Sequence, residues 1–235
     1  MNNFLKALLI GLVAPSFVFA QLQTENSATP SGLNFKASWE KTPSNASWTQ
    51  FSYELMDEEL ISHLDKAEDM QSFCPNFANL DREHQIYTWI ELFSQVTYYE
   101  SGWNPLSRMK ENLGIDPVTG VNVYSEGLLQ LSYQDMQKYP RAINPQNCQI
   151  DWQKDKNLSA KDPNKTILDP YINLECGMRI MADQIDQYGK IVISKDVYWS
   201  TLKKNGKYSV VPKIQKAIKK LSFCQSKKSL FRGWF

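Results

Sequence analysis

The chain has little histidine, with two residues in 235, His63 and His84, and neither lies in a recognisable motif. The G-x-S-x-G run that presents a serine nucleophile is also absent. These absences argue against a serine or cysteine nucleophile activated by histidine. The four cysteines are too widely spaced for a zinc site, so we expect no metal and no cofactor.

Long apolar runs are scarce as well, and the clearest one lies at the N-terminus. Residues 1–20 contain one lysine, continue as LKALLIGLVAPSFVFA and end in Val18-Phe19-Ala20. This pattern predicts a cleavable secretory signal peptide. The run is too short for a comfortable transmembrane span, and no cysteine follows that could carry a lipid. We therefore expect a periplasmic or secreted protein with no membrane anchor after signal cleavage.

The region after the signal lacks apolar periodicity. Residues 21–52 are rich in Ser, Thr, Asn and Pro, which predicts a flexible leader. Four aromatic residues in it can pack locally: Phe35, Trp39, Trp48 and Phe51. Residues 53–226 are long enough for one domain with a proper core, and no other segment has the apolar content for a second. Residues 227–235 form a basic tail.

The formal net charge is only +1, but the charges are unevenly distributed. After Ser200 the chain gathers ten cations with almost no acids between them: Lys203, Lys204, Lys207, Lys213, Lys216, Lys219, Lys220, Lys227, Lys228 and Arg232. Such a run is usually a solvated face. In an exported protein it would also attract an anionic cell-wall polymer. Export and the absence of a recognition motif argue against nucleic acid as a partner.

Four cysteines in an exported chain predict two disulfides, for which three pairings exist. We favour Cys74 with Cys224, which would tie the start of the domain to its last helix. The second bridge would then join Cys148 to Cys176.

The most informative stretch runs from Arg82 to Pro105. Six residues at three- and four-residue spacing share one helical face: Ile86, Trp89, Ile90, Phe93, Val96 and Thr97. Glu100 falls on the same face. Gly102 and Pro105 end the helix, so Glu100 should lie in the last turn, where low dielectric would raise its pKa. A partly solvated glutamate at a frayed helix end is the alternative from periodicity alone.

The remaining pattern is mostly helical. Helices are predicted at about 56–70, 82–101, 132–138, 170–188, 196–204 and 211–222, with a short sheet around 117–124. The long helix at 170–188 begins with an N-capping Asp169 followed by Pro170. The fold class is therefore mainly α with a small β-element.

Three short sequence runs follow one another along the chain: Glu100-Ser101-Gly102-Trp103-Asn104-Pro105, Gly127-Leu128-Leu129-Gln130 and Asn173-Leu174-Glu175-Cys176-Gly177. Together they resemble the soluble lytic transglycosylase family of the lysozyme-like superfamily, over roughly residues 80 to 225. The resemblance implies a lysozyme-like domain with its small β-element beside the active-site cleft. The connection at 106–124 is longer than is usual in that family.

The resemblance also implies substrate-binding residues. Gln130 offers one acceptor and two donors to an acetamido sugar. Asn173 belongs to the third run, although a structural role for it is open. Tyr198 lies where the family has a tyrosine facing the catalytic acid. The family's substrate-contacting serine has no clear counterpart; Ser125 is nearest by position, and Ser107 is the alternative.

By the same resemblance Glu100 is the catalytic acid and base of a peptidoglycan lytic transglycosylase. It would cleave the β-1,4 bond between N-acetylmuramic acid and N-acetylglucosamine and leave 1,6-anhydro ends. A hydrolytic muramidase using Glu126 or Asp116 as a second acid is the nearest alternative. A non-catalytic peptidoglycan-binding protein of a secretion apparatus is another. The expected partners are peptidoglycan glycan strands, and cell-envelope machinery is a further candidate.

Overall fold

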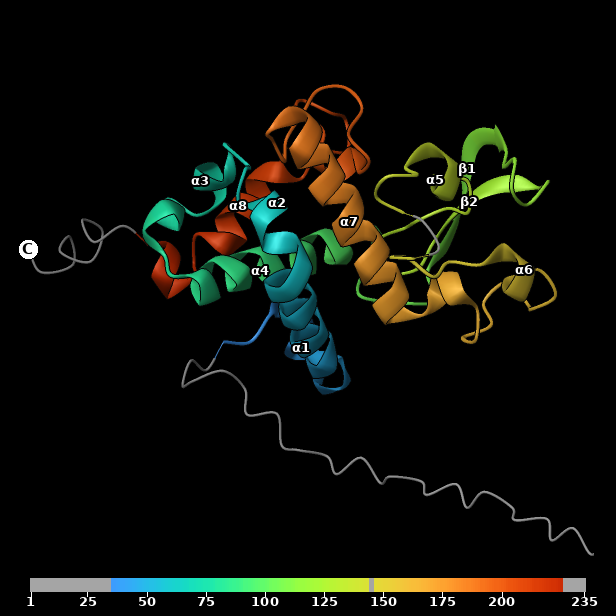
Figure 1. Cartoon of the computed structure of the whole chain (residues 1–235), viewed down its shortest axis with the longest axis horizontal. Coiled ribbons are helices and arrows are strands. Elements are labelled where there is room, and N and C mark those ends of the chain that lie inside the picture. Colours follow the sequence, from blue (N-terminus) through green and yellow to red (C-terminus); the bar gives the residue numbers. More distant parts are fainter. Residues whose placement is uncertain (1–34, 144–145, 226–235) are drawn as a thin grey trace, which may run out of the picture. The chain divides into compact units, whose positions relative to one another are not determined.

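The computed structural model of the chain describes residues 35–143 and 146–225. The predicted signal peptide, the first part of the predicted leader and the predicted basic tail lie outside these ranges. Within them the fold is mainly α with one two-stranded sheet, as predicted (Figure 1). Its elements are α1 (Ala46–Leu55), α2 (Ile61–Leu64), α3 (Met70–Phe73), α4 (Arg82–Ser101), β1 (Arg108–Ile115), β2 (Asn122–Glu126), α5 (Asp135–Lys138), α6 (Trp152–Asp155), α7 (Pro170–Tyr188) and α8 (Val211–Ile218).

Helix α4 is the central element and has the predicted bounds. The Asp81 carboxylate caps its first turn by accepting the His84 amide N–H at 2.9 Å. Gly102 ends it with a φ of 64°, a left-handed conformation that glycine adopts without strain. The sequence predicted one buried face, but every residue from Ile86 to Thr97 is buried. The reason is that α1, α8 and the segment before α1 all contact this helix.

Helix α7 also has its predicted bounds. Asp169 accepts the amide N–H groups of Tyr171 and Ile172, and Pro170 occupies the first helical position. The helix contacts both α1 and α2, and Figure 1 shows it running between these helices and the hairpin.

The segment from Phe35 to Ser52 is folded, so the predicted flexible leader is wrong for this part. Trp39 and Trp48 are buried and meet edge to face, with ring centroids 6.0 Å apart. Two polar residues on α4 hold the segment by its backbone: Glu91 accepts the Ser38 N–H at 2.9 Å, and Ser94 accepts the Trp39 N–H at 2.8 Å. Irregularly spaced aromatics leave no periodic pattern, yet each buries a large apolar area.

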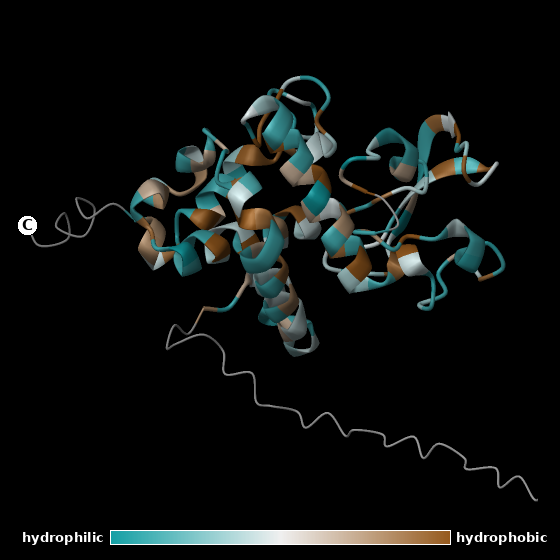
Figure 2. Ribbon diagram, in the orientation of Figure 1, coloured by the Kyte–Doolittle hydropathy of each residue, from teal (hydrophilic) through white to brown (hydrophobic). Residues whose placement is uncertain are grey.

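The sheet is larger than predicted and begins earlier. Strands β1 and β2 pair antiparallel, with Arg108 opposite Glu126, so part of the long connection at 106–124 is itself a strand. The predicted Thr-Gly turn lies between the two strands. Four hydrophobic residues of the hairpin are exposed: Met109, Leu113, Ile115 and Val121. Figure 2 shows the corresponding hydrophobic colour on these strands.

Four predicted helices are shorter or divided, and one of them is the helix predicted at 211–222, of which α8 covers Val211–Ile218. The predicted helix at 56–70 is replaced by a π-type turn at Met56–Leu60 and by α2, which together continue α1. Only α5 remains of the helix predicted at 132–138, and the 3₁₀ turn Ser200–Leu202 replaces the one predicted at 196–204. Boundaries of short helices depend on tertiary contacts more than on local pattern.

Both predicted disulfides are present. Cys74 is bonded to Cys224 and Cys148 to Cys176, with Cα–Cα distances of 4.7 and 5.2 Å. The first closes a loop with a sequence separation of 150 residues and fixes the region after α8 against the start of the domain. Disulfides of this kind are typical of proteins in oxidising compartments.

In the two described ranges no helix is both long and apolar enough to cross a membrane. The same ranges contain no cluster of three or more His, Cys, Asp or Glu side chains arranged to hold a metal ion.

We predict that replacing both Cys74 and Cys224 by serine lowers the free energy of unfolding by about 3–5 kcal/mol, because the open chain regains the entropy of a long loop. Replacing Cys148 and Cys176 should cost roughly 1–2 kcal/mol less, since that loop is shorter. Urea denaturation of the two variants and the wild type measures both effects. Equal losses in the two variants would contradict the loop-entropy explanation.

Candidate active site

Glu100 lies in the last turn of α4, as predicted, and its side chain is half-buried. The Thr201 hydroxyl, from the 3₁₀ turn Ser200–Leu202, donates a hydrogen bond of 2.5 Å to Oε1 of Glu100. This contact joins positions 101 residues apart in the sequence, so no local pattern could have indicated it. The turn Ser200–Leu202 also packs close to α4.

The Glu100 carboxyl is protonated more readily than an ordinary glutamate. Burial raises its pKa to about 7, because the ionised form loses hydration. The hydrogen bond from Thr201 opposes this rise, and the negative charge of Glu111 adds to it. At neutral pH a large fraction of the molecules therefore holds a proton at this position, as a general acid requires.

Glu111 on β1 is a second carboxylate at the site, and the sequence analysis missed it. Its Oε1 accepts a hydrogen bond of 2.7 Å from the Ser125 hydroxyl on β2. Ser125, predicted to contact substrate, thus orients Glu111. The signal that could have found Glu111 is a charged residue on a strand following the helix of Glu100. That strand was not recognised within the long connection.

The Gly127–Gln130 loop packs tightly against α7. A Cβ at Gly127 would lie 2.2 Å from Nδ2 of Asn173, and one at Gly177 would lie 2.3 Å from Cδ1 of Leu129. Larger residues at either glycine would push the loop away from the helix. The Gly127–Gln130 run and the Asn173–Gly177 run therefore pack directly against each other.

Two predicted substrate-binding residues are committed to this contact. Asn173 is fully buried: its Nδ2 donates to the carbonyls of Glu126 and Ile167, and its Oδ1 accepts the Leu129 N–H at 2.7 Å. These contacts favour a structural role for Asn173 over substrate binding, and the sequence analysis also favoured that role. Gln130 is buried too, and its Nε2 donates to the Gly127 carbonyl at 2.8 Å. That bond uses a donor that was expected to reach a sugar.

Tyr198 is one of the residues that line a cavity of about 460 Å³. Its hydroxyl donates to Oδ2 of Asp135 at 2.5 Å and lies 3.4 Å from the Gln130 carbonyl. Burial raises the Tyr198 pKa well above its usual value, and the charges of Asp135 and Glu100 raise it further. Tyr198 is therefore a neutral hydrogen-bonding group near neutral pH. Its neighbour Trp199 is buried and donates its indole N–H to the Leu129 carbonyl.

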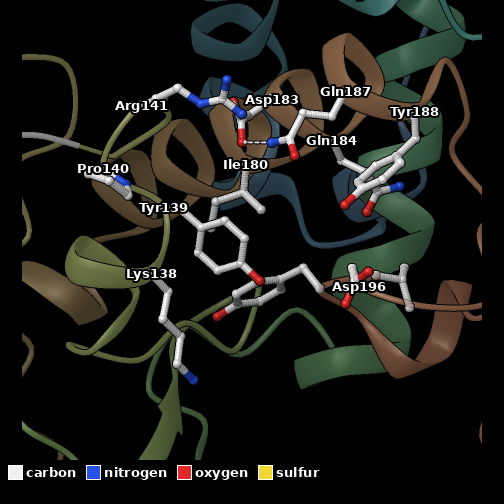
Figure 3. Close-up of a pocket in the computed structure, with 12 residues that line it drawn as sticks. Lys138, Tyr139, Pro140, Arg141, Ile180, Asp183, Gln184, Gln187, Tyr188 and Asp196 are labelled. Carbon is white, nitrogen blue, oxygen red and sulfur yellow. Dashed lines mark hydrogen bonds and ion pairs between the residues drawn. The ribbon is translucent and has the colours of Figure 1, made fainter.

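The cavity has aromatic, amide and charged walls. Tyr139, Tyr188 and Tyr198 contribute rings, and Tyr139 meets Tyr198 at 5.5 Å between ring centroids. Figure 3 shows Asp183 hydrogen-bonded to Gln187, both from α7. Glu100 does not itself line this cavity, and Tyr198 is the residue that relates the two. Rings with amide and carboxylate groups between them are the features that bind sugars in proteins.

The two acids proposed for a hydrolase, Glu126 and Asp116, are both buried and engaged, which argues against either of them as the second acid. Glu126 pairs with Lys165 at 2.8 Å and with Arg108 at 3.4 Å. Asp116 accepts backbone N–H groups from its own turn and from Gln134. Moving either carboxylate toward a substrate would leave buried donors or cations without partners.

Comparison with known proteins identifies the fold and leaves the activity open. No family model matches the chain, and no curated protein matches it. Solved structures of DslA from Bdellovibrio match it closely in shape. The wild-type form has a TM-score of 0.65 at 24% identity over 83% of this chain and 100% of that one. Two glutamate-to-glutamine mutants of DslA give TM-scores of 0.65 and 0.63 at 23% and 24% identity, with the same coverage. The chain therefore shares the fold of DslA, and this fold is mainly α with a small β-element, as predicted.

The raised pKa of Glu100 predicts a pH-dependent stability. Because the folded-state pKa exceeds the unfolded one, the folded state holds the proton more tightly, and stability falls as pH rises from about 4.5 to about 7. Glu100→Gln removes this loss. We expect it to exceed the wild type in unfolding free energy by roughly 2–3 kcal/mol at pH 8 and to match it near pH 4.

Urea denaturation at the two pH values measures this difference, and the exposed Glu58 on the same chain provides a control. Glu58→Gln should stay within about 0.5 kcal/mol of the wild type at both values. An unfolding free-energy difference for Glu100→Gln that does not change with pH would show that the carboxyl is not desolvated.

Proposed function

We propose that the protein cleaves the β-1,4 bond between N-acetylmuramic acid and N-acetylglucosamine in peptidoglycan, with Glu100 as the proton donor. The observation that carries the proposal is the half-buried Glu100 carboxyl, whose pKa of about 7 keeps it protonated near neutral pH. A glycosidic oxygen is a poor leaving group until it is protonated, so an acid with this pKa serves the reaction well.

The tyrosine-lined cavity supports a saccharide ligand. Sugar rings present axial C–H groups to aromatic faces and hydroxyls to amides and carboxylates, and Tyr139, Tyr198 and Gln187 offer these groups. Tyr198 lines the cavity and is close enough to Glu100 to feel its charge, which supports a glycan that occupies the cavity and extends toward the acid. Tyr198 remains our proposed substrate contact.

For the fate of the broken bond we propose transglycosylation, which needs one carboxylate. Glu100 gives its proton to the glycosidic oxygen as the bond from C1 breaks, and the carbonyl oxygen of the muramyl N-acetyl group attacks C1. The ionised Glu100 then takes the proton of the C6 hydroxyl, whose oxygen displaces the N-acetyl oxygen from C1. The product ends in a 1,6-anhydro ring, and Glu100 regains its proton.

Hydrolysis is a second candidate, and Glu111 is the observation that favours it. A second carboxylate near the acid can activate water or stabilise the cationic sugar. The two mutated glutamates in the DslA structures are eleven positions apart, as are Glu100 and Glu111 in this chain. Under this alternative Glu111 takes the role that was first assigned to Glu126 or Asp116.

A non-catalytic, peptidoglycan-binding role is the third candidate. The raised Glu100 pKa argues against it, because a buried ionisable group destabilises the fold and a protein that only binds glycan does not need an acid there. We further propose that the protein is exported to the periplasm or beyond, where peptidoglycan lies and where both disulfides can form. Association with cell-envelope machinery remains a proposal.

The proposal predicts that Glu100→Gln lowers turnover of purified sacculi by roughly two to four orders of magnitude while binding persists, since the amide cannot deliver a proton. Glu111→Gln is the comparison. Under transglycosylation it changes the rate modestly and the products stay 1,6-anhydro. Under hydrolysis it is as damaging as Glu100→Gln, and wild-type products carry reducing ends.

Mass spectrometry of the released muropeptides separates these results. Reducing-end products together with equal damage from both substitutions would overturn transglycosylation and support hydrolysis. Full activity of Glu100→Gln would overturn both. Binding without any released muropeptide from the wild type would support the non-catalytic role.

Thr201 predicts the pH range of activity. Its hydrogen bond favours the ionised form of Glu100, so Thr201→Val should raise the Glu100 pKa and move the alkaline limb of kcat/KM upward by roughly half to one pH unit. Thr201→Ser keeps the hydroxyl and should leave the limb where it is. A downward shift in the valine variant would contradict the assigned hydrogen bond.

A further inference from the structure

Nine exposed lysines lie in the segment before α1 and in residues 203–220, and we call them the lysine surface. They are Lys36, Lys41, Lys203, Lys204, Lys207, Lys213, Lys216, Lys219 and Lys220. Lys36, Lys41 and Lys220 line a hollow of about 360 Å³, which joins the N-terminal segment to the end of α8. Lysines distant in sequence therefore share one region of the surface.

The charges of the lysine surface are not neutralised. In the described part of the chain none of its members forms an ion pair, whereas other lysines such as Lys66 and Lys165 do. No aspartate or glutamate occurs between Val197 and Gln225. Glu91 lines the hollow and its charge acts on Lys41, but it is the single acid among the lining residues, which include three lysines. The surface consequently keeps a strong positive potential.

Two members of the lysine surface contact aromatic residues that flank Glu100 in the sequence. Nζ of Lys213 lies 5.9 Å from the ring centroid of Tyr99, the residue before Glu100. Nζ of Lys41 lies 5.5 Å from the ring of Trp103, which follows Glu100 by three positions. Thr201, which donates to Glu100, comes directly before the segment that carries Lys203 and Lys204. A ligand held by Lys41 and Lys213 would thus contact the end of α4 that carries Glu100.

The composition of the surface indicates the kind of ligand. Single exposed ion pairs contribute little, so an array of them favours a ligand that repeats its negative charge. All nine members are lysines, which are flexible point charges without the rigid fork with which arginine recognises a fixed phosphate. Closely repeated, mobile carboxylates meet both conditions.

We propose that the lysine surface binds the carboxylates of peptidoglycan stem peptides and holds the polymer against the Glu100 end of α4. This inference rests on the proposed function for the identity of the polymer. It assigns substrate capture to residues outside the glycan-cleaving groups. Capture of this kind raises the local concentration of substrate and weakens with salt.

The test uses three lysines on one helical face, Lys213, Lys216 and Lys220, changed together to glutamine. A matched control changes three exposed lysines elsewhere: Lys154, Lys156 and Lys161. Both triple variants carry Glu100→Gln in the full chain, so that binding is measured without cleavage. Each is pelleted with purified sacculi, and with sacculi whose carboxyls have been amidated, across a range of NaCl concentrations.

We expect the triple change at Lys213, Lys216 and Lys220 to weaken sacculus binding roughly tenfold at low salt, and the control change to alter it less than about twofold. Amidated sacculi and about 1 M NaCl should both abolish the difference, since neither leaves an effective attraction between the charges. Equal binding of the two triple variants, or binding unchanged by amidation, would overturn the inference.

The failure of this inference and the failure of the proposed function give different results. If binding follows the lysines and the wild type releases no muropeptides, the surface stands and the enzymatic function falls. If muropeptides are released and the lysine variant binds sacculi normally, the surface assignment falls alone. Loss of binding to double-stranded DNA in the lysine variant, with sacculus binding retained, would also overturn the stem-peptide assignment. Unchanged thermal unfolding confirms that each variant is folded.

Discussion

The structure depends on the burial of one helix and on the carboxyl at its end. Helix α4 is covered on all sides from Ile86 to Thr97, and Gly102 stops it immediately after Glu100. The carboxyl is therefore held where hydration is incomplete, at a cost that only the surrounding packing can offset. The Cys74–Cys224 bond and the N-terminal segment with Trp39 both contribute to that packing.

Two carboxylates at the site differ in their surroundings. Glu100 receives one hydrogen bond and is otherwise shielded, and its pKa is raised to about 7. Glu111 lies on the exposed hairpin and accepts a hydrogen bond from Ser125. A neighbouring negative charge stabilises the proton on Glu100, so even a Glu111 that takes no direct part in chemistry affects the acid. This dependence holds for transglycosylation and for hydrolysis alike.

The sequence predicted features that are encoded locally. The bounds of α4 and α7 follow from caps and periodicity. The sequence allowed three cysteine pairings, and the structure has the one that was favoured. Features that depend on distant contacts were missed or misjudged. The Trp39 backbone is held by Ser94 on α4, which is distant in the sequence. The hydrogen bond from Thr201 to Glu100 joins residues 101 positions apart. The contact of Asn173 with the Leu129 N–H is visible only in the folded loop. Glu126 illustrates the same limit, because its partner Lys165 comes from a separate loop.

The central claim is that Glu100 keeps its proton near neutral pH because it is desolvated. The direct measurement is a carbon-13 NMR titration of the glutamate carboxyls in the wild type, with Glu100→Gln used to assign the resonance. The account predicts a pKa near 7 for this one signal. A value near the ordinary 4.3 of a solvated glutamate would contradict it.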